Sequence, residues 1–290
     1  KQGESDTNME DGGLWQLSVL EEKFPVPDDC AGAIMYQIFP DRFFQAGVCD
    51  LTGKITPYWV HENKDDVPVY LPNANGEVLN NDFYGGNLNG IREKLPYLHA
   101  LGVEILYLNP IFYAWSTHRY DTCDYKRIDP MLGSEADFRA LCGAAHALGM
   151  KVIADMVFHG PLEYDPALGL PRSPYLDACP GWFMRHESGA YARTYTRSFD
   201  LGNPEYQRHI GDCMLSYIET MHVDGFRLDA QMWSETPNWD DRCPRQPYES
   251  VLAGMRMMDE IAPRVRAKYP HAFFYTEANG PYAAKGHEYR

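Results

Sequence analysis

Short runs of apolar residues alternate along the chain with longer segments whose apolar positions recur every three or four residues. The short runs are typical of buried strands, and the longer segments are typical of helices that cover them. Five strands are predicted, at 33–39, 103–108, 151–158, 224–229 and 272–277. Four helices are predicted, at 88–100, 135–148, 204–222 and 246–268. Repeated alternation of strand and helix predicts a parallel sheet with helices on its faces.

Helix boundaries carry signals of their own. Ser134 precedes the second predicted helix and Asp137 follows three residues later, which indicates a capping box. Pro204 suits the first turn of the third helix, because its missing N–H would have no helical partner there. Gly102 and Gly149 end the first two helices, since glycine readily adopts the left-handed conformation that follows a helix.

Polar residues suited to chemistry follow the carboxyl ends of the predicted strands. A (β/α)8 TIM barrel carries its active site at that end. A doubly wound open sheet is the competing architecture, but no predicted strand leads into a G-x-G-x-x-G turn. About five of the eight strand–helix units of a barrel fit into the chain. The sequence therefore predicts an α/β protein with an incomplete (β/α)8 TIM barrel.

Four segments make up the predicted domain organisation. Residues 1–30 are an N-terminal extension or linker, and residues 31–158 form the first part of a catalytic barrel. Residues 159–200 lack a regular pattern and are predicted to be a small irregular domain inserted after the third strand. Residues 201–290 continue the barrel through its fifth strand. Within the first part, residues 45–82 are rich in Asn, Asp, Gly and Pro and predict a long excursion.

Two carboxylates end two successive predicted strands. Asp229 closes the run 224–229, and Glu277 closes the run 272–277. Cleavage of a glycosidic bond with retention uses such a pair, one as nucleophile and the other as general acid. Side chains alternate along a strand, so Arg227 is expected on the same face as Asp229, where its positive charge would keep Asp229 ionised.

Charge and composition narrow the range of partners. The chain has 290 residues and a formal net charge of −15, which argues against nucleic acid or an anionic membrane as the main partner. A neutral sugar is compatible with that charge. The 20 Tyr, 13 Phe and 6 Trp include faces that suit pyranose rings, although most are expected in the core. No apolar stretch is long enough to span a membrane.

Seven cysteines are scattered along the chain without a C-x-x-C pair. A zinc site or a dense disulfide framework is therefore not expected. Free thiols indicate a reducing compartment, so a cytoplasmic location is favoured over secretion, with the localisation otherwise open. The chain begins with Lys1 rather than Met, which leaves open the removal of a leader or of a whole upstream domain.

Several segments, in matching order and spacing, resemble the α-amylase family of glycoside hydrolases, especially its neopullulanase, cyclomaltodextrinase and maltogenic amylase branch. Tyr36–Phe43 is similar to the first barrel strand of that branch, and Phe83–Leu88 to the entry into its first helix. Leu108–Phe112 and Thr117–Tyr125 resemble the loop after the second strand. The likeness runs from about residue 31 to 280 and implies a retaining hydrolase of α-glucosidic bonds in starch-derived oligosaccharides, cyclodextrins or pullulan.

The resemblance also implies catalytic roles. Asp229 would be the nucleophile that forms a covalent glycosyl-enzyme, and Glu277 would be the general acid and then the general base. Arg227 would position Asp229 and keep it ionised. Retention would place the two carboxyl groups roughly 5–5.5 Å apart, close enough for direct attack.

Four further residues would contact substrate or support the site. Tyr120 would stack on the sugar ring at the cleavage subsite, with His118 nearby, and Asp155 would hold Arg227 and the strand ends together. The family usually has Val-Phe-Asn-His after this strand, whereas here Phe158 is followed directly by His159. His159 either takes the place of that histidine or the sugar contact is lost.

Each of these residues also has a structural interpretation when it is taken alone. Asp229 would cap a helix, Glu277 would be a solvated loop residue, and Arg227 would form a strand-end ion pair. Tyr120 and His118 would pack within a loop. The catalytic interpretation depends on the joint pattern, in which Arg and Asp share one strand face and Glu ends the next strand.

Two departures from the family pattern concern metal binding and completeness. Calcium needs several hard oxygen ligands, and only Asp50 and Asn87 are available where the branch often holds it, so a site without cofactor or metal is expected. The third essential carboxylate of the family, an Asp after a His, has no counterpart after Glu277. We therefore expect the 290-residue chain to be a fragment that binds glucan poorly and turns over little.

Other functions remain compatible with the sequence. A transglycosylase or isomerase would use the same covalent intermediate but pass the glycosyl group to sugar. A non-catalytic fragment would only bind an α-glucan oligosaccharide, the partner expected under every alternative. A homo-oligomer is left open, because relatives in this branch often pair through an N-terminal domain that has no counterpart here.

Overall fold

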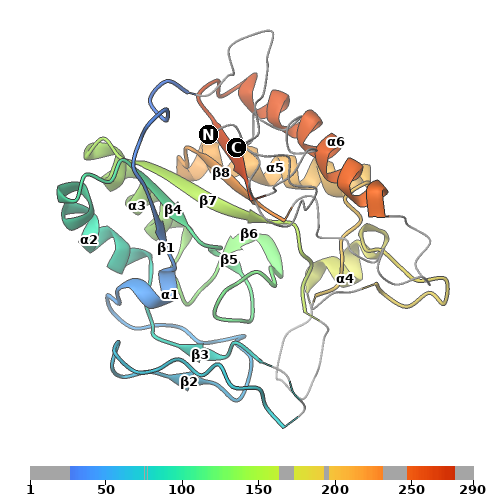
Figure 1. Cartoon of the computed structure of the whole chain (residues 1–290), viewed down its shortest axis with the longest axis horizontal. Coiled ribbons are helices and arrows are strands. Elements are labelled where there is room, and N and C mark those ends of the chain that lie inside the picture. Colours follow the sequence, from blue (N-terminus) through green and yellow to red (C-terminus); the bar gives the residue numbers. More distant parts are fainter. Residues whose placement is uncertain are drawn as a thin grey trace, which may run out of the picture.

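Five parallel strands form one sheet in the order β1-β4-β7-β8-β9 (Figure 1). The computed structural model describes residues 27–74, 76, 78–162, 173–192, 196–230 and 247–277. The strands are β1 (Met35–Ile38), β4 (Ile105–Leu108), β7 (Lys151–Val157), β8 (Gly225–Asp229) and β9 (Phe273–Thr276). Spatial neighbours follow the order of the chain, with helices in the crossovers, which is the arrangement of a (β/α)8 barrel. The described residues thus comprise five strands of such a barrel, as predicted.

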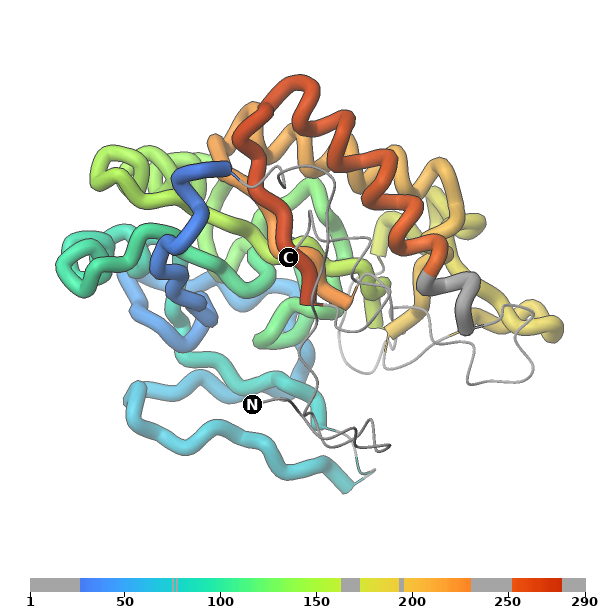
Figure 2. Tube along the Cα trace, turned by 45° about the horizontal axis from the view of Figure 1, so that its top comes forward, coloured from blue at the N-terminus to red at the C-terminus, as the bar shows by residue number. Residues whose placement is uncertain are grey.

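Long helices cover the outer face of the sheet. They are α2 (Leu88–Ala100), α3 (Glu135–Ala147), α5 (Pro204–Met221) and α6 (Pro247–Arg266). The two tubes of α5 and α6 run side by side across one half of the molecule, and α2 and α3 lie beside the other half (Figures 1 and 2). Phe226 and Leu228 point from β8 into the main hydrophobic cluster, where both are fully buried. Burial of this face holds the sheet under the helices.

The boundary signals of the sequence are confirmed. The Ser134 side chain accepts a hydrogen bond from the Asp137 N–H, and the Asp137 carboxylate accepts one from the Ser134 N–H, which completes the capping box. The cap of α2 was not predicted: Asn87 accepts a hydrogen bond from the Gly90 N–H at 2.8 Å. Gly102 has a φ of +82°, in the region that a residue with a Cβ adopts at a cost.

Two small sheets were not predicted. β2 (Trp59–Val60) and β3 (Asp82–Phe83) form a short parallel ribbon within the predicted excursion. β5 (Phe112–Tyr113) and β6 (Asp124–Ile128) form an antiparallel hairpin after β4. Strands of two residues are too short to show alternation, and the Asp-Tyr-Lys-Arg-Ile segment of β6 mixes charged with apolar side chains.

The region after β7 has little regular structure where it is described. It contains α4 (Pro174–Ala178) and a 3-10 turn at Pro180–Trp182. A second short helix, α1 (Pro40–Phe43), follows β1 and does not belong to this region. Trp182 and Phe199 are buried in the main hydrophobic cluster together with residues of α5. This region therefore shares its core with the barrel, and its status as a separate domain stays a prediction.

The structure bears on three further features: the cysteines, the N-terminal linker and membrane-spanning helices. The six cysteines among the described residues are free thiols, and Cys243 lies outside the described residues, as does most of the predicted N-terminal linker. None of the described helices combines the length and apolar character needed to cross a bilayer.

Candidate active site

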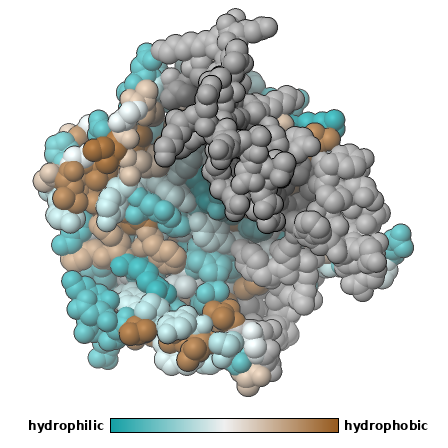
Figure 3. Space-filling view, in the orientation of Figure 1, coloured by the Kyte–Doolittle hydropathy of each residue, from teal (hydrophilic) through white to brown (hydrophobic). Residues whose placement is uncertain are grey.

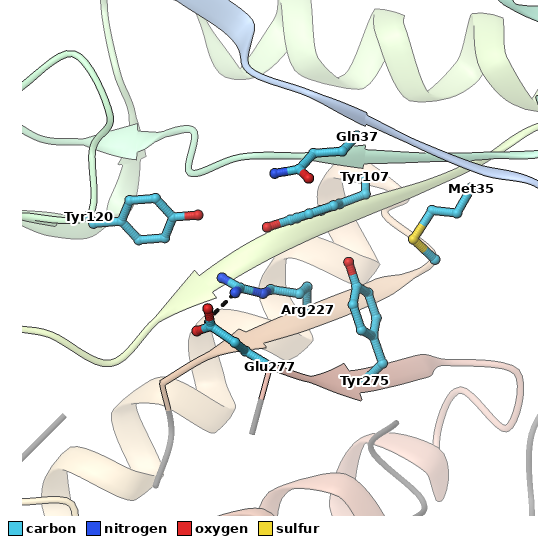
Figure 4. A pocket seen from close by; sticks show the side chains of 7 residues that line it. All are labelled: Met35, Gln37, Tyr107, Tyr120, Arg227, Tyr275 and Glu277. Atoms are coloured by element: carbon cyan, nitrogen blue, oxygen red, sulfur yellow. Dashed lines mark ion pairs between the residues drawn. The ribbon is translucent and has the colours of Figure 1, made fainter. Parts of the chain in front are cut away.

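Arg227 binds three carboxylates at the carboxyl end of the sheet. Its Nη1 lies 2.5 Å from Asp229 Oδ1 and 3.0 and 3.1 Å from the two oxygens of Asp155. Its Nη2 lies 3.0 Å from Glu277 Oε2, the ion pair drawn in Figure 4. The structure therefore brings together all three residues predicted to be catalytic, with Asp155 beside them.

Strand register explains this convergence. Asp155 on β7 is the Cα partner of Arg227 on β8, and Val157 is the partner of Asp229. Alternation turns Arg227 and Asp229 to the inner face of the sheet, whereas the apolar residues between them face the helices. Glu277 follows the last residue of β9, and its N–H donates to the carbonyl of Leu228 at 3.2 Å.

Asp155 is fully buried and accepts hydrogen bonds from two tyrosines in addition to its ion pair with Arg227. The hydroxyls of Tyr107 and Tyr120 both donate to its Oδ2, at 2.5 and 2.9 Å. Burial raises the pKa of Asp155, and Arg227 and the hydroxyl donors lower it, with a net rise to about 6. The two tyrosines thus support the carboxylate form of a group that burial would otherwise neutralise.

Electrostatics at Asp229 differ from the expectation. Burial raises the pKa of Asp229, and the neighbouring carboxylates of Asp155 and Glu277 add to the rise. Arg227 lowers the pKa, as predicted, but the opposing causes outweigh it and the pKa reaches about 8. Three carboxylates share one guanidinium, so a single positive charge does not neutralise the cluster.

His118 and Tyr120 lie together on the loop between β5 and β6. The Tyr120 N–H donates to His118 Nδ1 at 3.0 Å, and the ring centroids are 5.7 Å apart. Burial lowers the pKa of His118, which favours the neutral imidazole. With Nδ1 accepting a backbone N–H, the ring proton is assigned to Nε2.

Buried charges hold this loop in place. Asp129 accepts from Lys54 Nζ, and its Oδ2 lies 3.2 Å from Arg119 Nε. Arg119 has a φ of +63° and its Nη1 donates to the Thr117 carbonyl at 2.7 Å. Asp121 accepts from the Trp115 N–H at 3.0 Å. The segment that carries His118 and Tyr120 is therefore tied to the protein interior.

His159 lies at the edge of the same site. Its Nε2 is 3.8 Å from Asp229 Oδ2, and its side chain is 15% exposed. Burial lowers the pKa of His159 to about 4, so the imidazole is neutral near pH 7. The structure thus brings His159 to the site, and its contact with sugar stays a prediction.

A cavity of about 550 Å³ opens beside the cluster (Figure 4). The residues that line it are Met35, Gln37, Tyr107, Tyr120, Arg227, Tyr275 and Glu277. In the figure Tyr107 and Arg227 reach toward Tyr120, and the Tyr275 hydroxyl points into the same space. A sugar ring placed here would meet aromatic faces and a carboxylate, a combination suited to carbohydrate.

Sequence reasoning missed Gln37, Tyr107, Asn109 and Tyr275. Strand alternation could have found two of them. Tyr275 lies two residues before Glu277, so alternation places both side chains on the inner face of the sheet. Tyr107 is the Cα partner of Gln37, and their side chains lie on that same face. Asn109 entered the prediction only as part of Leu108–Phe112, the segment that resembles the family's loop after the second strand.

Among the described residues, no group of three or more His, Cys, Asp or Glu side chains is arranged to hold a metal ion. The two candidate calcium ligands have other partners, since Asn87 caps α2 and Asp50 accepts from the Thr52 N–H at 2.9 Å. The absence of a cofactor stays a prediction.

Several large hydrophobic side chains in or near the β2–β3 ribbon are exposed, and in Figure 3 single brown residues lie among hydrophilic ones in the lower part of the view. The exposed side chains include Tyr58, Trp59, Val60, Tyr70 and Leu71. The ribbon adjoins the site loop, because the Thr117 N–H donates to the Asn80 carbonyl at 2.8 Å.

Comparison with known proteins agrees with this geometry. Residues 37–162 match the model of the alpha amylase catalytic domain. The amylopullulanase of Thermoanaerobacterium thermosulfurigenes is 43% identical over 201 residues, which cover 64% of this chain and 11% of that protein. The intracellular maltogenic amylase of Bacillus subtilis strain 168 is 35% identical over 222 residues, 72% of this chain and 34% of that protein.

Among solved structures, the type III pullulan hydrolase of Thermococcus kodakarensis has a TM-score of 0.68 and 29% identity. The superposition covers 91% of this chain and 46% of the hydrolase. The chain therefore spans less than half the length of each of these three relatives.

Proposed function

Because the chain belongs to the α-amylase family, we propose that its site hydrolyses α-glucosidic bonds with retention of anomeric configuration. The substrates would be starch-derived oligosaccharides, cyclodextrins or pullulan. The observation that carries the proposal is the convergence of Asp229 and Glu277 on the guanidinium of Arg227. Amylopullulanase, maltogenic amylase and neopullulanase are the names of relatives, which supports an α-glucan as substrate.

The first chemical step joins enzyme and sugar. An oxygen of Asp229 attacks the anomeric carbon while Glu277 donates its proton to the leaving glycosidic oxygen. The C–O bond to the leaving group breaks as the bond to Asp229 forms. In the second step Glu277 takes a proton from water, and the water oxygen attacks the anomeric carbon. The bond to Asp229 breaks, which leaves Asp229 as a carboxylate and Glu277 protonated again.

Neighbouring residues would prepare the site for these steps. Arg227 contacts one oxygen of Asp229, which leaves the other free of this contact for attack. Tyr120 would stack on the sugar ring. His118 and His159, both neutral, would form hydrogen bonds with the sugar hydroxyls. Asp155 would hold Arg227 in place through two oxygens.

Replacement of Glu277 by Gln tests the role of the general acid. The 290-residue chain is expected to turn over slowly, so the substrate is maltohexaose at high concentration, whose leaving hydroxyl needs a proton from Glu277. We expect this slow hydrolysis to fall at least about a hundredfold, while maltotriose binding, followed by calorimetry, changes less than threefold. Glu187→Gln is the matched control, because Glu187 is exposed in a turn and does not line the cavity. Equal turnover in the Glu277→Gln variant would remove Glu277 from the mechanism.

Covalent trapping tests the nucleophile without sustained turnover. Asp229 should displace fluoride from a 5-fluoro-α-glucosyl fluoride, with release of the fluoride ion to solvent. The stable ester that remains is seen as one added 5-fluoroglucosyl group in the intact mass. Peptide mapping should place the adduct on Asp229, and Asp229→Asn should not react. An adduct on another residue would refute the assignment.

Transglycosylation uses the same intermediate and is separated by its products. If the site passes the glycosyl group to sugar, NMR at high maltose will show longer oligosaccharides in place of hydrolysis products. Maltotriose binding without an adduct or turnover would instead favour a non-catalytic glucan-binding function.

A further inference from the structure

A row of hydrogen bonds connects the ends of β1, β4 and β7. Gln37 Nε2 donates to Asn109 Oδ1 at 2.9 Å, and Asn109 Nδ2 donates to the Tyr120 hydroxyl at 2.9 Å. The Tyr120 hydroxyl donates to Asp155 Oδ2, also at 2.9 Å. Asn109 is 6% exposed and Asp155 is fully buried, so water does not readily replace the two bonds that Tyr120 makes to them, whereas Gln37 is exposed.

The chemistry of the four groups fixes the direction of every bond. The Asp155 carboxylate only accepts, so Tyr120 gives it the one hydroxyl proton. Tyr120 must then accept from Asn109, which turns the Asn109 NH₂ toward the ring. The Asn109 carbonyl oxygen is left facing Gln37, whose NH₂ satisfies it. The opposite orientation of Asn109 would place its oxygen against a hydroxyl oxygen that has no second proton to donate.

We propose that Asn109, oriented by Gln37, is a positioning residue that fixes the Tyr120 ring as the sugar-stacking platform. The proposal rests on the proposed function, which gives Tyr120 that role. With its hydroxyl held at two points, the ring keeps one tilt beside the cavity that Arg227 and Glu277 also line (Figure 4). A stacked ring contributes to binding only when its face is parallel to the sugar, so loss of tilt weakens binding.

The substitution Asn109→Leu tests this role, because leucine has the same number of side-chain heavy atoms as asparagine and the same branching at Cγ, but no hydrogen-bonding group. We expect KM for p-nitrophenyl α-maltotrioside and the calorimetric Kd for maltotriose to rise about tenfold, the effect of one lost hydrogen bond and a freed ring. The kcat should stay within about twofold, because stacking acts equally on ground state and transition state. Asn89→Leu is the matched control, since Asn89 makes its hydrogen bond to Asp137 between α2 and α3.

A double-mutant cycle separates positioning from general stabilisation. Tyr120→Phe keeps the ring but removes the hydroxyl through which Asn109 acts. Asn109→Leu should therefore change Kd less than about twofold in the Tyr120→Phe background. A tenfold effect of Asn109→Leu in both backgrounds, or no effect in the native background, would overturn the proposal.

Failure of the proposed function gives a different result. In that case the unsubstituted chain would form no glycosyl adduct on Asp229 and would not bind maltotriose even at high concentration, and the positioning role would fall with it. A functional unsubstituted chain whose Asn109→Leu variant is unchanged would overturn the positioning role alone.

Discussion

At the scale of single residues, the site is defined by one cation among three acids. Arg227 contacts Asp155, Asp229 and Glu277, and two tyrosine hydroxyls support Asp155. Burial raises the pKa values of Asp155 and Asp229 above their ordinary range, and at Asp229 the carboxylates of Asp155 and Glu277 add to the rise. Groups whose pKa values depart in this way are common where protons are moved in catalysis.

The raised pKa of Asp229 predicts the pH dependence of the reaction. The nucleophile must be ionised, so kcat/KM should rise with pH as Asp229 loses its proton, with an acid limb well above the ordinary Asp value of 3.8. Asp155→Asn removes a negative charge next to Asp229 and should therefore move that limb to lower pH. It should also lower the maximum rate, because an amide holds the Arg227 guanidinium less strongly than a carboxylate does. A pH–rate profile of each variant measures the shift, and an unmoved limb would contradict this account.

Elements between the strands place the residues that we propose to bind substrate. The loop between β5 and β6 carries His118 and Tyr120, and it is anchored by the buried charges of Lys54, Arg119 and Asp129. Burial raises the pKa of Asp129, but Arg119 and Lys54 outweigh it and hold that pKa below its usual value. The carboxylate therefore stabilises the fold above its unfolded pKa, and this contribution is lost as the pH falls through the folded pKa.

Asp129→Ala should show the cost of breaking this anchor. We expect it to lower the free energy of unfolding by about 3–5 kcal/mol, because two buried cations would lose their partner. KM should rise as well, since the loop that holds Tyr120 would lose its support. Urea unfolding near pH 7 measures the effect, with exposed Asp65→Ala as control. A loss below about 1 kcal/mol would show that the anchor contributes little.

At the scale of the whole molecule, the core under the helices keeps the strand ends in register. Phe226 is fully buried between the sheet and the covering helices, one residue before Arg227. One face of β8 thus packs against the core, and the other carries Arg227 and Asp229, the residues proposed for the chemistry.

Phe226→Ala should therefore destabilise the whole fold. We expect a loss of about 3–5 kcal/mol in the free energy of unfolding, from the lost transfer energy and the cavity left behind. Val67→Ala is the matched control, because Val67 is 73% exposed. Urea unfolding of both variants tests this, and similar midpoints for the two would contradict the assignment of Phe226 to the core.

The sequence by itself determined the strands, the long helices, their caps and the face on which Arg227 and Asp229 lie. Those features depend on local periodicity and on the residue types at element ends, which the chain displays directly. It could not show β5 and β6, whose short strands lack a clear period.

Only the tertiary structure decided which distant residues meet. Register between β7 and β8 brings Asp155 to Arg227, and the loop after β5 brings Tyr120 to Asn109 and Asp155. Burial then raised the pKa of Asp229 against the effect of the arginine beside it. Desolvation and the sum of neighbouring charges depend on the packed arrangement of segments far apart in the chain, so no local pattern contains them.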